Sequence, residues 1–357
     1  MEIGIVGLPN VGKSSLFNAL TKASIAAENY PFTTIEPNVG VVDVPDERLE
    51  FLSNTYKSEK IVPATIKFVD IAGLVKGAAE GEGLGNQFLG HIRACDAIAE
   101  VVRCFRDETI IHVTGRVDPT DDISTVNTEL LLADLEQVTK SLQVLSDRLK
   151  RQDKEAQKLQ PILEAAAKML NNGQPLRRNP ELSASLKSYN FLTAKPLLYI
   201  ANVGERPDEQ LITAVRQQAE QDNAVVVVIS VKNELEIIDL PPDEQVEFRR
   251  ELGLQSGLGA VIQAGYKLLN LETFLTAGPQ EVRAWTIIRG TKAPQAAGKI
   301  HTDFERGFIR AEVFNVNDLR QFGTEKAVRE NGRLRSEGKE YVVKDGDVVE
   351  FLFNVRS

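Results

Sequence analysis

A glycine-bracketed loop near the start of the chain constrains the fold more than any other feature. Residues 7 to 14 read GLPNVGKS, after a mostly apolar run and before a stretch with helical spacing. This loop matches the pattern G-x-x-x-x-G-K-[ST] at Gly7, Gly12, Lys13 and Ser14. Its glycines let backbone N–H groups converge on phosphate oxygens, and the following helix N-terminus adds positive potential. The motif predicts an α/β P-loop fold that binds a nucleoside triphosphate.

The residues after this loop indicate what the bound nucleotide does. Lys13 is expected to reach the β- and γ-phosphates, and Ser14 to bind Mg²⁺. Thr34, in PFTTIEP, can close over the γ-phosphate and Mg²⁺, although a capping role is the alternative. Asp70 ends an apolar run in FVDIAGLV and would hold Mg²⁺ through water, with the Gly73 N–H facing the γ-phosphate. The order of these elements favours a nucleotide-dependent switch, and the glycine-rich stretch 77–90 is the segment expected to reorder.

The apolar runs along the chain predict a mostly parallel sheet with helices on both faces. Beyond the first run, five more have strand character: 39–44, 66–69, 97–102, 196–201 and 224–229. Such near-continuous apolar strands, alternating with helices, are typical of α/β domains.

A helical repeat interrupts this pattern between 131 and 170. Its apolar residues are spaced four and three apart, at Leu131, Leu135, Val138, Leu142, Leu145 and Leu149, and again at Leu159, Leu163, Ala166 and Leu170. One unbroken helix would carry Pro161 in its interior, which removes a hydrogen bond. We therefore predict an antiparallel helical hairpin that turns at 151–153, with Asp153 capping the second helix and Pro161 kinking it.

The C-terminal part reads as a separate small domain. The sequence TAGP at 276–279 is a natural break, and strand patterns follow at 282–288, 308–313 and 341–353. A helix is expected at 317–330, and KDGD indicates a turn before the final strand. The predicted domains are residues 1–123 with 194–277, the arm 124–193, and the C-terminal domain 278–357.

Composition excludes several other classes of protein. The 357 residues are 42% hydrophobic and 26% charged, close to the globular average. Two cysteines cannot form a disulfide framework, and three scattered histidines show no metal-ligand spacing. No apolar stretch approaches the roughly 20 residues of a transmembrane helix, and Glu2 lies where a signal peptide carries positive charge. We expect a cytoplasmic protein without membrane contact.

Charge is distributed unevenly along the chain. The net charge is −9, yet residues 140–195 carry 11 Lys and Arg against 5 Asp and Glu. An acidic body with one basic segment is expected when that segment meets a polyanion, and a solvated helical face is the alternative. The basic candidates near the turn and return of the arm are Arg148, Lys150, Arg151, Lys154, Lys158, Arg177 and Arg178.

Several long motifs together resemble one known family. GLPNVGKSS, PFTTIEPN, FVDIAGLVKGAAEGEGLGNQFL and ANVGE, with APQAAGKIHTDFERGFIRAEV and KDGDVVEFLFNV, closely resemble the YchF or Obg-like ATPases over nearly the whole chain. The resemblance implies a GTPase-like domain of the OBG type, an inserted helical coiled-coil arm and a terminal TGS domain of β-grasp type. It also implies an ATP-hydrolysing switch that associates with the ribosome or ribosomal RNA through the arm and the TGS domain, and regulates translation or a stress response.

The loop after the fifth strand of the nucleotide domain bears on the choice of base. Guanine-specific relatives carry N-K-x-D there, whereas this chain has Asn202, Val203, Gly204 and Glu205. Loss of the lysine and lengthening of the aspartate can remove a bidentate contact to guanine, at about 1–3 kcal/mol of discrimination. The resemblance implies ATP, with GTP weaker and Val203 lining the adenine site. An ordinary turn after a strand is the alternative. The nucleotide contacts are expected from Asn10, Val11, Gly12, Lys13, Ser14, Ser15, Asn202, Val203, Glu205 and Ser230.

The hydrolytic step departs from the Ras-like pattern. Leu74 occupies the position where those enzymes have a water-orienting glutamine, and an apolar side chain cannot hold that water. His112, in the loop after the fourth strand, is one candidate for the role, although a packed histidine is the alternative. Asn10 is the other candidate, because asparagine at this position seats K⁺ in related potassium-activated enzymes. The cofactors expected are thus Mg²⁺ and an activating K⁺.

Three other functions stay open at the level of sequence. They are a GTPase with the same architecture, a nucleotide-gated scaffold with little hydrolysis, and a metabolic P-loop kinase. A kinase would need an arginine-bearing lid, and no such segment stands out.

Overall fold

The computed structural model describes residues 1–25, 38–71, 84–107, 109–112, 115–251 and 257–354. These residues form two compact units. The first comprises the described residues of 1–25, 38–40 and 67–268, and the second those of 41–66 and 269–354. No helix in the described part of the chain is long and apolar enough to cross a membrane.

A six-stranded sheet forms the centre of the first unit. Its strand order is β2-β4-β1-β5-β6-β7. The strands are β2 (Val39–Asp43), β4 (Thr65–Asp70), β1 (Glu2–Val6), β5 (Ala97–Cys104), β6 (Leu197–Val203) and β7 (Val225–Ile229). The pairs from β4 through β1, β5 and β6 to β7 are all parallel. Every residue of β5 and β6 is buried, so the predicted parallel sheet with two covered faces is confirmed.

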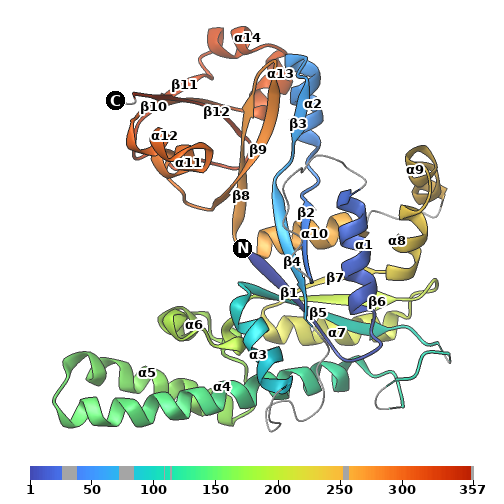
Figure 1. Ribbon diagram of the computed structural model, residues 1–357, viewed down its shortest axis with the longest axis vertical. Coiled ribbons are helices and arrows are strands. Elements are labelled where there is room, and N and C mark those ends of the chain that lie inside the picture. Colours follow the sequence, from blue (N-terminus) through green and yellow to red (C-terminus); the bar gives the residue numbers. More distant parts are fainter. Residues whose placement is uncertain (26–37, 72–83, 108, 113–114, 252–256, 355–357) are drawn as a thin grey trace. The chain divides into compact units, whose positions relative to one another are not determined.

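Helices lie on both sides of this sheet (Figure 1). On one side are α1 (Lys13–Ile25) and α10 (Gly257–Leu268), and on the other α3 (Leu84–Ala94), α4 (Pro119–Lys150) and α7 (Glu209–Asp222). Two further helices, α8 (Val231–Ile238) and α9 (Pro242–Glu251), follow β7. The loops after β1, β5, β6 and β7 therefore lie at the carboxyl ends of parallel strands. This is the edge of the sheet at which α/β proteins bind ligands.

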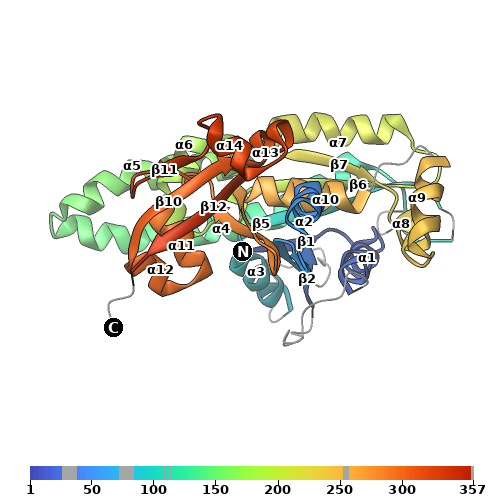
Figure 2. The ribbon, with the colours of Figure 1, turned by 90° about the horizontal axis from the view of Figure 1, so that it is seen from above.

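The predicted helical hairpin is present as α4 and α5 (Lys154–Asn171), which lie side by side in both views (Figures 1 and 2). The chain turns at 151–153, and the Asp153 carboxylate accepts hydrogen bonds from two N–H groups of the first turn of α5. The seam is buried at Val138, Leu145, Leu163 and Leu170. α5 continues as one helix through Pro161. α4 already begins at Pro119, so its first turn precedes the predicted start of the arm.

The arm returns to the first unit through short helices: η1 (Leu176–Arg178), α6 (Pro180–Ser185), η2 (Lys187–Tyr189) and η3 (Leu192–Ala194). Asp134 of α4 anchors this return, because its buried carboxylate accepts hydrogen bonds from the N–H groups of Leu192 and Thr193. The base of the arm is thus rigidly joined to the segment that re-enters β6.

The second unit contains a mixed sheet of order β11-β10-β12-β8-β9-β3. Its strands are β11 (Arg335–Glu337), β10 (Phe308–Asn315), β12 (Asp347–Phe353), β8 (Leu271–Ala277), β9 (Glu281–Ile288) and β3 (Lys60–Val62). Its helices are α2 (Glu47–Tyr56), α11 (Ala293–Ile300), α12 (Thr302–Arg306), α13 (Val316–Phe322) and α14 (Glu325–Glu330). Phe274, Phe308 and Phe351 form its aromatic core with the buried alanines of α11. The predicted class, a P-loop α/β domain with a mixed C-terminal domain, is confirmed.

Three details of the second unit differ from the sequence-based expectations. The expected boundary at 277/278 falls inside the second unit, because residues 278–280 form the turn between β8 and β9, where the Gly278 N–H bonds to Glu281 O. The helix expected at 317–330 is divided at Gly323, which has a φ of +80°. The last strand begins only at Asp347, after the expected Asp-Gly turn.

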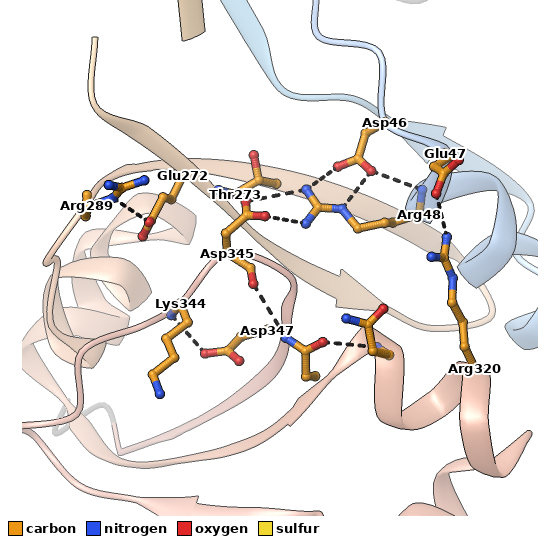
Figure 3. Close-up of polar contacts among 12 residues, drawn as sticks. Asp46, Glu47, Arg48, Glu272, Thr273, Arg289, Arg320, Lys344, Asp345 and Asp347 are labelled. Carbon is orange, nitrogen blue, oxygen red and sulfur yellow. Dashed lines mark hydrogen bonds and ion pairs between the residues drawn. The ribbon is translucent and has the colours of Figure 1, made fainter. Parts of the chain in front are cut away.

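An ionic network joins α2 to the loop before β12 within the second unit (Figure 3). The Arg48 guanidinium donates to both oxygens of Asp46 and, at 2.7 Å, to Asp345 Oδ2. Asp345 also accepts from the Thr273 N–H at 2.9 Å. The α2 segment is therefore part of the second unit, a long-range association that no local pattern predicted.

Candidate nucleotide-binding site

The phosphate loop lies between β1 and α1, as its motif predicts. Gly7 and Gly12 have φ values of +146° and +103°, which side-chain-bearing residues rarely adopt. A Cβ at Gly7 would lie 2.5 Å from Val101 O, and one at Gly12 would overlap the side-chain amide of Asn202. The two glycines are therefore required both by backbone conformation and by the close approach of neighbouring strands.

Lys13 is held by the loop that precedes it. Its ammonium donates to Leu8 O at 2.7 Å, and the side chain is 8% exposed. Burial lowers the pKa of Lys13, while the negative charge of Asp70 opposes this shift. A cation so placed at the N-terminus of α1 suits a phosphate group, which would replace the carbonyl as its partner.

Ser14 and Asp70 form a pair suited to Mg²⁺. Ser14 Oγ donates to Asp70 Oδ2 at 3.1 Å, across the sheet from α1 to the end of β4. Asp70 Oδ1 is buried and has no hydrogen-bond partner among the described residues, which leaves one carboxylate oxygen available to a cation or its water. The described residues hold no cluster of three or more His, Cys, Asp or Glu side chains. Magnesium that keeps waters and binds substrate phosphates does not need such a cluster.

Asn202 serves as a brace between three loops. Its amide Nδ2 donates to Val11 O at 2.9 Å, and its Oδ1 accepts from the Val231 N–H at 3.1 Å. The residue is 5% exposed, so both atoms bond inside the protein. Asn202 thus connects the phosphate loop to the start of α8 and holds the loop that was expected to contact the base.

The remaining residues expected at the base site lie around that brace. Val203 ends β6 and is 5% exposed. Glu205 is exposed, and Lys232 donates to it at 2.8 Å, which lowers the pKa of Glu205. Ser230 caps α8, where its side chain accepts from the Asn233 N–H. The Glu205 carboxylate is therefore already paired with a cation, unlike a carboxylate reserved for a guanine edge.

The loop after β5 reaches the phosphate loop. Asn10, with a φ of +63°, donates through Nδ2 to Ile111 O at 3.1 Å. The next residue, His112, is buried, and its Nε2 lies 3.0 Å from Asp122 Oδ2 in the first turns of α4. Burial raises the pKa of Asp122, and the bond to His112 opposes this shift. His112 is thus a packed residue in this conformation, yet it lies next to a residue that contacts the P-loop.

Asp122 contacts His112, and the sequence interpretation did not single it out. Its only local signal is its place in the first helical turns after the Asp118 cap, where acidic residues are common. Among the other expected contacts, Val11 is buried and Ser15 is exposed in the first turn of α1. Thr34, Gly73 and Leu74 lie outside the described residues, as do residues 77–83 of the glycine-rich stretch.

The arm carries exposed cations near its turn. Arg151, Lys154 and Lys158 are exposed and make no ion pair with the described residues. Arg148 binds Asp153, and Lys150 binds Asp147.

Arg177 and Arg178 do not belong to this surface, and their expected role as polyanion contacts is wrong. Arg177 is 6% exposed and donates to Asn127 Oδ1, while Arg178 donates to the buried carboxylate of Asp222 at 2.8 Å. Both lie where the returning chain packs against α4 and α7, so they stabilise the base of the arm.

Comparisons with known protein sequences give matches over the full length of the chain. The ribosome-binding ATPase YchF of Haemophilus ducreyi is 55% identical, over 99% of both chains. YchF of Bacillus subtilis is 51% identical over 99% of this chain and 100% of its own. Obg-like ATPase 1 of Gallus gallus is 45% identical over 99% of this chain and 92% of its own.

Two family models match parts of the chain. YchF-GTPase_C, described as a protein of unknown function, matches residues 271–354, which begin at β8. The model described as 50S ribosome-binding GTPase matches residues 2–168. Among solved structures, the YchF GTPase of Schizosaccharomyces pombe has a TM-score of 0.88 at 40% identity and covers 99% of this chain and 97% of its own. The names of these relatives thus differ on the base, ATP for some and GTP for others.

Proposed function

This chain belongs to the YchF family, and from that premise we propose that it is an ATP-binding and ATP-hydrolysing switch that associates with the ribosome. The observation that carries the proposal is the Ser14–Asp70 pair beside Lys13, with the orphaned Asp70 Oδ1 placed for a hydrated cation. Ser14 and Asp70 would hold Mg²⁺, which would neutralise phosphate charge in the bound nucleotide. The names of the relatives supply the ribosome and ATP as the partners to test.

The base loop supports ATP over GTP. A guanine site needs a free carboxylate at a fixed reach, whereas Glu205 is one methylene longer than aspartate and is paired with Lys232. Val203 replaces the lysine whose stem packs over guanine and presents a smaller apolar surface.

Calorimetric titration of the nucleotide-free chain with ATP and GTP, each with Mg²⁺, tests this choice. We expect ATP to bind more tightly. GTP binding tenfold more tightly, about 1.4 kcal/mol, would instead establish the GTPase alternative.

Hydrolysis in this proposal depends on the loop that joins the P-loop to the arm. Asn10 reaches Ile111, and His112 is held by Asp122 at the start of α4. A movement of α4 would therefore act directly on His112, which is the proton acceptor in the proposal. With Leu74 in place of glutamine, turnover without the ribosome should be slow, and release of His112 should raise it.

Potassium provides a separate test of the same site. Asn10 is the residue through which K⁺ would act, because the cation could offset charge that develops on the phosphates. Turnover is compared in KCl and NaCl at equal ionic strength. Faster turnover in KCl supports this role, and equal rates would remove it.

The arm is the proposed ribosomal contact. Arg93, Lys140 and Arg148 line a surface cavity of about 440 Å³ with Tyr189, next to the α4 face. Cations beside an aromatic ring suit a phosphate backbone with unstacked bases. Together with the exposed cations near the turn, they make the arm the stronger electrostatic element, since residues 278–357 are nearly balanced at 14 basic against 12 acidic residues. The TGS-like domain would contribute a second contact.

Charge reversal at Arg151, Lys154 and Lys158 tests the arm. Ribosome co-sedimentation of this triple variant should weaken strongly and depend less steeply on salt, because fewer counterions are released. The matched control reverses Lys22, Lys67 and Arg216, whose side chains are about half exposed in the first unit outside the arm. If both variants sediment as the parent does, the basic segment is a solvated helical face.

The two other enzymatic alternatives are separated by product and rate. Mass analysis that finds a phosphorylated acceptor would favour a kinase. Turnover that stays negligible with ribosomes present would favour the nucleotide-gated scaffold, which Leu74 permits.

A further inference from the structure

The sheet of the second unit opens a cavity of about 500 Å³ between two of its strands. β12 pairs with β10 along its whole length, whereas it pairs with β8 at a single position, Val348 with Leu275. Every lining residue belongs to the second unit. The aromatic part of the lining includes Trp285, Phe304 and Phe351. The cavity is therefore a slot beside the aromatic core, formed where parallel strands separate.

The charged part of this lining has one sign. Four glutamates line the cavity and no lysine or arginine does, although Arg283 lies 3.8 Å from Glu281 and Arg329 lies 3.9 Å from Glu325. Glu325, one of them, accepts a hydrogen bond from the Tyr56 hydroxyl at 3.1 Å, which fixes an acidic group at the rim. An apolar slot with a carboxylate rim is complementary to a cation carried on an apolar stem.

Two of these glutamates lie directly opposite each other. Glu312 of β10 pairs with Glu350 of β12 in the antiparallel ladder. Like charges at such positions destabilise a sheet. Arg310 and Arg329 lie 3.4 and 3.5 Å from Glu312, whereas Glu350 is exposed and makes no ion pair with the described residues. A local arrangement that lowers stability is typical of a functional site, where a ligand supplies the missing charge.

We propose that this cavity binds a lysine- or arginine-bearing segment of a basic polypeptide. The side-chain stem lies along the apolar lining, and the cationic head reaches Glu350 beside Glu312, on the sheet face that they share with Val348 and Phe314. Glu350, which makes no ion pair with the described residues, would repel a phosphate group, so we expect a protein partner here. The inference concerns the second unit alone and is independent of the nucleotide and of the arm.

Trp285 makes the binding directly observable. It is the only tryptophan in the chain and lines the cavity, so its fluorescence reports occupancy. The full chain is titrated with a hexa-arginine peptide at low salt, and with hexa-lysine in parallel. We expect a saturable change in Trp285 emission. The uridine hexanucleotide, which carries the opposite charge, should give none.

Glu350→Lys is the decisive variant. It should weaken peptide binding about tenfold or more, while the urea midpoint of Trp285 fluorescence stays equal or rises because the like-charge pair is gone. Glu340→Lys is the control, since it makes the same charge change at an exposed residue paired with Lys292 outside the cavity.

Three results would overturn the proposal: no saturable change with either peptide, a saturable change in Trp285 emission with the uridine oligomer, or equal weakening by Glu350→Lys and Glu340→Lys. Equal weakening would mean that the peptides respond to the net charge of the protein and do not bind in the cavity.

Discussion

Replacing Asn202 with alanine should loosen the phosphate loop more than any substitution at the exposed base-loop residues. The change removes the donor to Val11 O and the acceptor for the Val231 N–H, both at a site that is 5% exposed. A buried backbone group left without a partner costs about 1–3 kcal/mol. Two such groups, with some relaxation of the loops, give a loss of about 3 kcal/mol in the stability of the first unit.

The measurement is urea unfolding followed by far-UV circular dichroism, together with titration of a fluorescent ATP analogue. Tryptophan fluorescence would not report this unit, because Trp285 lies in the second. Binding should weaken about tenfold or more, because the phosphate-binding conformation is less populated. Glu205→Ala is the control, since it removes only an exposed ion pair and should leave stability nearly unchanged. A variant Asn202→Ala as stable as Glu205→Ala would refute the bracing role.

Three further outcomes are expected. Lys13→Ala should lose most ATP-analogue binding with an unchanged circular dichroism spectrum, and retained turnover would contradict the assigned site. Burial raises the pKa of Glu100, so the folded chain keeps a proton that the unfolded chain loses above about pH 4.5. The parent's stability should therefore fall as the pH rises above that value. Because glutamine carries no titrating proton, the urea midpoint of Glu100→Gln should increasingly exceed the parent's from about pH 5 to 8. Arg48→Met should destabilise the second unit by about 2 kcal/mol in Trp285-detected unfolding, because Asp46 and Asp345 lose their shared cation; an unchanged midpoint would show that the network is not stabilising.

Local signals predicted the parts of the fold that depend on neighbouring residues. Gly7 and Gly12 have positive φ values and lie close to Val101 and Asn202, so no larger residue fits at either position. The two glycines are visible in the P-loop motif. The turn of the arm follows from the seam spacing and from Asp153, whose capping bonds reach only two and three residues ahead. Such features need no knowledge of the rest of the chain.

The parts that depend on distant pairing could not be predicted. β3 joins β9 through residues 60–62 and 281–283, and no period or turn indicates that partner. The TAGP sequence has the composition of a linker and of a tight turn alike, and only the β8–β9 pairing decides between them. Arg177 has the sequence context of a solvated cation, yet tertiary packing buries it.

The site shows the same division. The Ser14–Asp70 pair was predictable because both residues belong to motifs in a fixed order. The contact of His112 with Asp122 was not, since it joins a loop residue to the first turns of α4, ten residues further along the chain. The hydrogen bonds of Asn202 to neighbouring loops could not be predicted either, because an asparagine at the end of a strand can bond to a ligand or to a neighbouring loop equally well.

Ribosome co-sedimentation with ADP, ATP and a non-hydrolysable ATP analogue, at one salt concentration, tests the central claim most directly. A switch that reads the γ-phosphate through Asp70 and the loop beside it should associate to different extents with the analogue and with ADP. Lys13→Ala should abolish that difference, because both nucleotides then bind weakly. Equal sedimentation of the parent chain in all three nucleotide states would contradict the account of a nucleotide-controlled ribosome switch.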